Sequence, residues 1–128
     1  MGLAFNIDAA HPTPLYHQLE RAIRFAIATG KLALGDQLPT VRQLAVDLQI
    51  NANTVAKVYA ELERLGIVET RRGVGTFVKA RHFEAARDKD RDRELRELED
   101  HFLGKAAQLG FPAKEAADHL RDRLKNLK

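Results

Sequence analysis

The feature that most constrains this sequence is a break at residues 49–53 between two stretches with helical spacing of apolar residues. Apolar residues recur three and four positions apart over residues 41–48, and the same spacing resumes over residues 55–65. The break contains Asn51 and Asn53, and asparagine favours turns and caps because its side chain bonds to nearby backbone groups. The pattern predicts two helices joined by a tight turn.

A longer helix is predicted before this pair, over residues 15–27, where apolar residues keep the same spacing. Thr13 is the predicted N-cap, with Pro14 at the first helical position, where its missing N–H costs nothing. Thr40 is the predicted cap of the short second helix, and Gly66 is the predicted stop of the third. Three helices therefore precede the next segment.

Residues 67–79 read as a hairpin, because two β-branched, alternating stretches flank the tetrapeptide Arg72-Gly73-Val74-Gly75. Two glycines one residue apart also occur in nucleotide-binding loops. Here they lie between strands and open no helix, which favours a plain hairpin turn. Tyr59, Phe25 and Phe77 are assigned to the core on their apolar spacing.

From Arg81 onward the composition changes to dense mixed charge, typical of a solvated helix face, with a narrow apolar stripe. A final helix is predicted from about Pro112. The stripe either packs on that helix or forms a surface shared with a second subunit. Two short helices bury little apolar area, whereas four from two chains form a small bundle, so we favour a homodimer. The predicted dimer interface comprises Leu95, Leu98, Phe102, Leu109, Leu120 and Leu124.

The predicted fold is mainly α with a small β-hairpin: a winged helix-turn-helix domain over residues 1–80 and a two-helix dimerisation arm over residues 81–128. Whether residues 81–94 continue the first arm helix or act as a hinge is left open. The chain has no cysteine, which excludes disulfides and thiolate metal sites and suits the cytoplasm. No apolar run reaches membrane-spanning length, and the N-terminus has no pattern of a secretory signal.

The net charge of +3 divides into +2 for residues 1–80 (nine basic, seven acidic) and +1 for residues 81–128 (twelve basic, eleven acidic). The position of the basic residues is therefore more informative than their total. A helix after a tight turn can present its first residues to base edges in the major groove, and a glycine-bearing hairpin can approach phosphates. The predicted DNA contacts are Arg42, Asn51, Asn53, Thr54, Lys57, Arg71, Arg72 and Gly73.

Four blocks of the chain, at residues 38–45, 51–57, 62–66 and 71–78, together resemble the GntR family of bacterial transcription regulators. The resemblance spans about residues 12–79. The short helical C-terminal part looks like the YtrA-type subfamily rather than the relatives with large effector-binding domains. The resemblance implies homodimers that bind palindromic operators in double-stranded DNA and usually act as repressors. It places DNA contacts on Arg42, Asn51, Asn53, Thr54, Lys57, Arg72 and Gly73.

The chain departs from some relatives at Ala52 and Ala56, where those relatives carry arginine, so an operator sequence cannot be transferred to it. Asn51 and Asn53 also have a purely structural interpretation as turn and cap residues. The alternative function is a protein-interaction adaptor that uses a winged helix without DNA. No acid, base or metal cluster points to an enzyme, no cofactor is implied, and an effector remains unknown.

Overall fold

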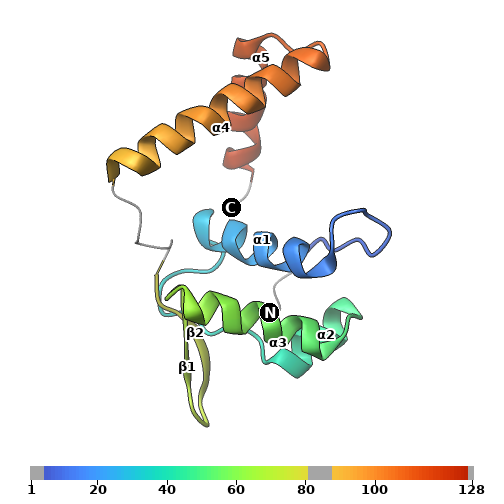
Figure 1. Cartoon of the computed structure of the whole chain (residues 1–128), viewed down its shortest axis with the longest axis vertical. Coiled ribbons are helices and arrows are strands. Elements are labelled where there is room, and N and C mark those ends of the chain that lie inside the picture. The colour runs from blue at the N-terminus through green and yellow to red at the C-terminus, as the bar shows by residue number, and fades with distance from the viewer. Residues whose placement is uncertain (1–4, 81–87, 127–128) are drawn as a thin grey trace. The chain divides into compact units, whose positions relative to one another are not determined.

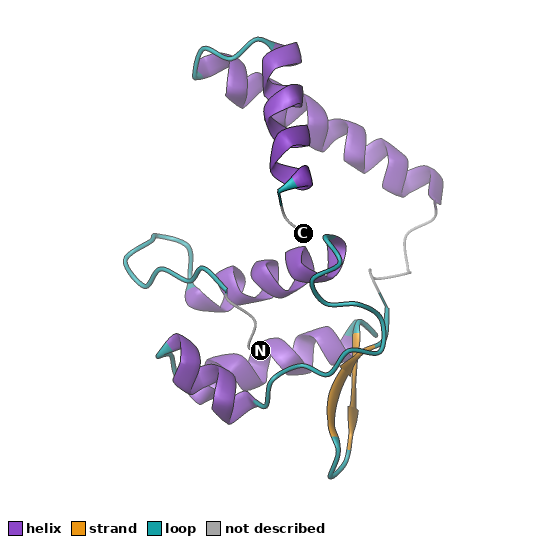
Figure 2. Ribbon diagram, turned by 180° about the vertical axis from the view of Figure 1, so that it is seen from behind, coloured by secondary structure: helices purple, strands orange, loops and turns teal. Residues whose placement is uncertain are grey.

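The computed structural model describes residues 5–80 and 88–126, with the backbone alone for residues 88 and 89. The chain divides into two compact units, Met1–Phe83 and Glu84–Lys128. No helix in the described ranges is long and apolar enough to cross a membrane. The first unit contains three helices and a two-stranded antiparallel hairpin, and the second contains two helices, as Figures 1 and 2 show. The elements are α1 (Leu15–Ala28), α2 (Val41–Leu48), α3 (Ala52–Arg64), β1 (Val68–Arg71), β2 (Gly75–Val78), α4 (Asp88–Gln108) and α5 (Ala113–Lys125).

The core of the first unit lies among α1, α2, α3 and the base of the hairpin. Each helix buries one apolar stripe and leaves the opposite face to solvent, as amphipathic helices of a small domain do. Leu62 of α3 and Ile67, just before β1, are buried together with the stripes of α1 and α2. The largest fully buried side chains are Leu19, Ile23, Leu44, Val55, Val58, Leu62, Ile67 and Val68.

The turn between α2 and α3 is held by local hydrogen bonds. Thr40 Oγ1 accepts from the backbone N–H of Gln43 at 3.0 Å, which confirms the predicted cap of α2. At the other end of α2 the N–H of Ile50 reaches the carbonyl of Ala45 at 3.1 Å. Gln49 adopts the left-handed conformation there, with φ of 57°, so that the chain reverses within two residues.

The hairpin pairs β1 with β2 from Val68 opposite Val78 to Arg71 opposite Gly75. A short segment before α2 lies along the other edge of β2. The N–H of Leu38 donates to the carbonyl of Thr76 at 2.8 Å. Both views show the hairpin tip extending beyond the helices of its unit (Figures 1 and 2).

Two details of α1 differ from the prediction. The helix begins at Leu15 with Pro14 at the cap position, and no side chain caps it, so the assignment of Thr13 as the cap is wrong. Gln18 instead connects α1 to the segment before it, because its Nε2 donates to the carbonyl oxygen of Thr13 at 2.7 Å and its Oε1 accepts from the N–H of Asp8 at 2.9 Å. Phe25 is 43% exposed rather than part of the core, since it lies on the face of α1 opposite Ile23.

The other two aromatic assignments have different outcomes. Tyr59 is buried in the core, as predicted. Phe77 is only half-buried, because it belongs to the hairpin face that also carries Arg71, and its ring lies against the Arg71 guanidinium rather than within the core cluster.

The second unit consists of α4 and α5, which pack against each other through small residues. Ala106 and Ala116 are its buried residues among those described. Gly110 ends α4 in the left-handed conformation, and the N–H of Phe111 donates to the carbonyl of Ala106 at 3.0 Å. Of the segment left open between helix and hinge, residues 88–94 belong to α4, and residues 81–87 lie outside the described residues.

Candidate nucleic-acid interface

The start of α3 presents three of the predicted contact residues to solvent. Asn51 is the N-cap, and its Oδ1 accepts from the N–H of Asn53 at 2.7 Å, so its structural role is confirmed. The side chains of Asn53 and Lys57 are exposed and lie four residues apart, one turn along the same helix face. Thr54 is half-buried beside them. The first turns of α3 therefore offer amide and ammonium groups on one accessible face.

Arg42 lies in the first turn of α2 and is exposed. Its guanidinium forms no hydrogen bond or ion pair with the described residues, and the same holds for the ammonium group of Lys57. Both charges are therefore available to an external anion. The cap at Thr40 leaves part of the first-turn N–H groups of α2 for such an anion as well.

The two arginines of the hairpin have different environments. Arg71 is engaged within the protein: its Nη2 lies 3.4 Å from Glu69 Oε2, and its guanidinium lies 4.4 Å from the centre of the Phe77 ring. Arg72 is exposed at the tip and has no partner among residues 5–80 and 88–126. Gly73 follows with φ of 76°, a conformation that glycine adopts without strain. Arg72 is thus the freer of the two cations.

Three residues position these elements through side-chain contacts that no sequence pattern predicted. Gln37 donates from Nε2 to the carbonyl oxygen of Val74 at 3.1 Å, at the hairpin tip. Glu63 of α3 accepts from the N–H of Thr70 at 3.2 Å and so connects α3 to β1. Their partners lie 37 and 7 residues away in sequence, and no local pattern marks either contact.

The third such residue is Tyr59, whose Oη donates to the carbonyl oxygen of Pro39 at 2.6 Å. This bond connects the middle of α3 to the residue just before the cap of α2. Burial raises the pKa of the Tyr59 phenol, so the hydroxyl stays protonated and able to donate even at alkaline pH, where an ordinary tyrosine ionises. The periodicity of α3 placed Tyr59 in the core but gave no sign of its partner.

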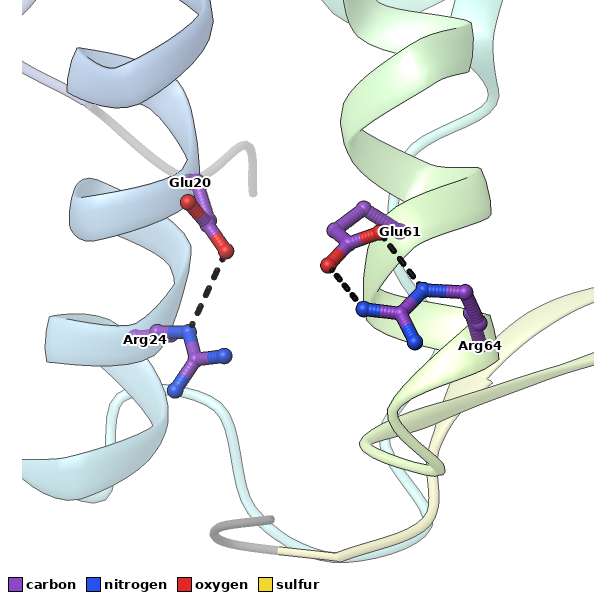
Figure 3. A network of polar contacts seen from close by, with 4 residues as sticks. All are labelled: Glu20, Arg24, Glu61 and Arg64. Carbon is purple, nitrogen blue, oxygen red and sulfur yellow. Dashed lines mark hydrogen bonds and ion pairs between the residues drawn. The ribbon is translucent and has the colours of Figure 1, made fainter.

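Two other arginines of the unit are paired within their own helices (Figure 3), whereas Arg21, Lys31 and Lys79 are exposed and have no side-chain partner among the described residues. On α1, Arg24 Nε lies 3.6 Å from Glu20 Oε2, and on α3, Arg64 Nη2 lies 2.7 Å from Glu61 Oε2. The hydrogen bond from Arg64 lowers the pKa of Glu61, and the charge of Arg24 acts in the same direction. These cations are balanced by carboxylates, in contrast to Arg42, Lys57 and Arg72.

The predicted dimer residues of the second unit are all exposed in the single chain. Their exposed fractions range from 42% for Phe102 to 77% for Leu109. The contact of α4 with α5 therefore leaves the apolar stripe largely uncovered. A hollow of about 280 Å³ lies beside it, lined by Phe102, Lys105, Ala106, Leu109, Phe111, Ala116 and His119.

The described residues contain no group of three or more histidine, cysteine, aspartate or glutamate side chains placed to hold a metal ion. The groups that the structure offers to an external ligand on α2, α3 and the hairpin are hydrogen-bonding amides and unpaired cations.

The sequence of this chain is similar to those of known bacterial proteins. The family described as "Bacterial regulatory proteins, gntR family" matches residues 15–78. The uncharacterised HTH-type transcriptional regulator YhcF of Bacillus subtilis is 38% identical over 108 residues, 84% of this chain and 88% of the relative. The HTH-type transcriptional repressor YtrA of Bacillus subtilis is 46% identical over 73 residues, 57% of this chain and 56% of the relative.

Solved structures agree in fold. YtrA from Sulfolobus acidocaldarius, a GntR-family transcription factor, superposes with a TM-score of 0.58 at 35% identity, covering 73% of this chain and 96% of that one. The DNA-binding domain of AraR, solved in complex with operator ORX1, superposes with a TM-score of 0.53 at 25% identity, covering 61% of this chain and 98% of that one.

Proposed function

The chain belongs to the gntR family of bacterial regulatory proteins and is a DNA-binding transcription regulator, and we propose that it acts as a repressor that binds a palindromic operator as a homodimer. The observation that carries the DNA-binding surface is the position of three exposed cations without internal partners: Arg42, Lys57 and Arg72 lie on the three elements that a winged helix-turn-helix presents to DNA. Arg21, Lys31 and Lys79 are also unpaired but lie outside these three elements.

In this proposal α3 enters the major groove with its N-terminal end foremost. Asn53 and Lys57 face the base edges, where asparagine pairs with adenine and lysine with guanine. Arg42 and the N-terminal N–H groups of α2 bind a phosphate, which fixes the register of α3. Arg72 and Gly73 bring the hairpin to the neighbouring backbone. Arg71, held by Glu69 and Phe77, shapes the hairpin more than it contacts DNA.

The homodimer forms through the second unit. Its two helices leave Leu95, Leu98, Phe102, Leu109, Leu120 and Leu124 exposed. A second copy would cover this face and complete a four-helix arrangement, which two helices alone cannot achieve. Two identical reading heads related by a twofold axis require an operator with the same symmetry, with half-sites about one helical turn apart.

The repressor role rests on the relatives. YtrA of Bacillus subtilis carries the name of a repressor and matches the part of this chain that contains the proposed DNA surface. A bound dimer blocks transcription when its operator overlaps the promoter, and it needs no further domain to do so. A regulator of transcription works where the chromosome lies, so we propose the cytoplasm as its location. The adaptor alternative leaves the unpaired cations on α2, α3 and the hairpin tip unexplained, and the relatives are named as transcriptional regulators.

A selection from random duplex DNA at near-physiological salt tests this function. We expect an enriched palindrome whose half-site spacing reports the distance between the two copies of α3. The mass of the free and bound protein by sedimentation gives the number of subunits. Enrichment of a single unrepeated site by a monomer would contradict the proposed homodimer. Enrichment of no sequence would contradict the proposed recognition of an operator. Placing the selected site over a promoter in a reporter assay distinguishes repression from activation.

A further inference from the structure

Gln37 connects the segment before α2 to the tip of the hairpin. Its backbone forms a bridge with Phe77 of β2, so the residue lies at the edge of the hairpin. From there its side chain reaches along the strand, and Nε2 donates to the carbonyl oxygen of Val74 at 3.1 Å. A single side chain thus joins the segment before α2 to the part of the hairpin that carries Arg72.

Gly75 provides the space for this contact. Its φ is 146°, a backbone conformation that residues with a side chain rarely adopt. A Cβ atom at this position would collide with Nε2 of Gln37. Glycine is favoured at Gly75 by its backbone conformation, and the amide of Gln37 lies in the space that a Cβ atom would occupy.

The other side-chain anchor of the hairpin acts further from the tip. Glu63 accepts hydrogen bonds from the N–H and the Oγ1 of Thr70, at 3.2 and 3.3 Å, within β1. Residues 72–74 extend beyond this anchor. Among the described residues, Gln37 is the side chain from outside the hairpin that hydrogen-bonds to this tip.

We propose that Gln37 is a positioning residue that holds the hairpin tip in the conformation in which Arg72 meets the DNA backbone. This inference rests on the proposed function. A two-stranded hairpin is marginally stable alone, and ordering a loose tip on binding costs free energy. A tip that is already held avoids that cost, and the hydrogen bond from Gln37 supplies the restraint without contacting DNA.

The test is a double-mutant cycle on the selected operator, with Gln37→Met and Arg72→Ala. Methionine keeps the length and the apolar stem of Gln37 but removes the donor. We expect Gln37→Met to weaken binding by about 3- to 10-fold, the range for loss of one hydrogen bond. The slope of log affinity against log salt should fall by about 1, as for Arg72→Ala, because the same phosphate contact is lost. The double variant should bind no more weakly than Arg72→Ala.

Two further variants test whether the effect is specific to the contact of Gln37 with the hairpin tip. Gln108→Met removes an exposed glutamine amide of α4 and should bind like the wild type with the same salt slope. Gly75→Ala pushes the amide of Gln37 away and also strains the backbone at φ of 146°, so it should reduce the slope and bind at least as weakly as Gln37→Met. Hydrogen exchange in the free protein adds a readout without DNA, since the N–H of Val74, bonded to the carbonyl of Arg71, should exchange faster in Gln37→Met at an unchanged melting temperature.

Wild-type binding by Gln37→Met, or a double variant that multiplies the two single losses, would overturn the inference while leaving the proposed function intact. Failure of the wild-type chain to select any duplex would overturn the proposed function, and the positioning of Arg72 for DNA would fall with it.

Discussion

The phenolic hydroxyl of Tyr59 donates to the carbonyl oxygen of Pro39 over 2.6 Å, across 20 positions of sequence. Tyr59 lies on the buried side of α3, and Pro39 precedes the cap of α2. The bond therefore connects the helix that carries Lys57 to the start of the helix that carries Arg42. The geometry of the helix-turn-helix depends on this contact as well as on the local turn.

Tyr59→Phe should lower the free energy of unfolding by about 1 kcal/mol at pH 7, because one hydrogen bond is lost. Burial raises the pKa of the folded phenol above its ordinary value of 10.0. Above pH 10 the unfolded chain loses this proton while the folded chain keeps it, so the stability of the wild type falls as pH rises. Phenylalanine has no such proton, and the difference between the two proteins should therefore shrink above pH 10. Denaturant unfolding of both proteins at pH 7 to 11 measures this difference in the free energy of unfolding. A difference that stays constant over this range would contradict the raised pKa of Tyr59.

Lys57→Ala should weaken operator binding by about 1 to 3 kcal/mol if the ammonium group reads a base, and should then relax the preference at one operator position. If the substitution only reduces the slope of log affinity against log salt, Lys57 contacts a phosphate instead. Arg64→Ala is the matched control, because Arg64 lies on the same helix but is paired with Glu61. Equal losses in the two variants would show that only the charge of α3 matters, which would remove Lys57 from specific contact.

Asn51 has two roles that substitution can separate. Asn51→Ala removes the acceptor for the N–H of Asn53 and should cost about 1 kcal/mol of stability, measured by thermal unfolding. Asn51→Ser keeps a capping oxygen and should restore most of that stability. If the serine variant still binds the operator weakly, the amide of Asn51 also contacts DNA. Full binding by the serine variant would leave Asn51 as a cap alone.

Leu98→Asp should convert the protein to a monomer, because it places a charge in the apolar face that the second copy is proposed to cover. The side chain is exposed in the single chain, so helix content by circular dichroism should stay unchanged. Leu34→Asp, an equally simple change at an exposed leucine of the first unit, should leave the mass unaltered. Sedimentation at micromolar concentration measures the mass of each variant. If the Leu98→Asp protein is still a dimer, the interface does not include this face of the second unit.

The local elements could be predicted from the sequence because their causes lie within a few residues. Apolar spacing predicted the three helices of the first unit, and Thr40 and Asn51 cap their helices through bonds to N–H groups two or three residues later. The hairpin followed from alternation and its glycines. The exceptions are the cap of α1, which lies at Pro14 rather than Thr13, and two aromatic side chains, Phe25 and Phe77, that lie outside the core.

What the sequence alone determined was which segments are helices, where the turn lies, and which residues of the arm form an apolar stripe. Only the tertiary structure decided which cations are free and which are paired, and which side chains hold the reading elements together. Arg71 and Arg72 are adjacent in sequence, yet Phe77 and Glu69 engage one and leave the other exposed. The contacts of Tyr59 with Pro39 and of Gln37 with Val74 join residues 20 and 37 positions apart. Such contacts depend on how the helices and strands pack together. The spacing of apolar residues within one helix or strand does not predict them.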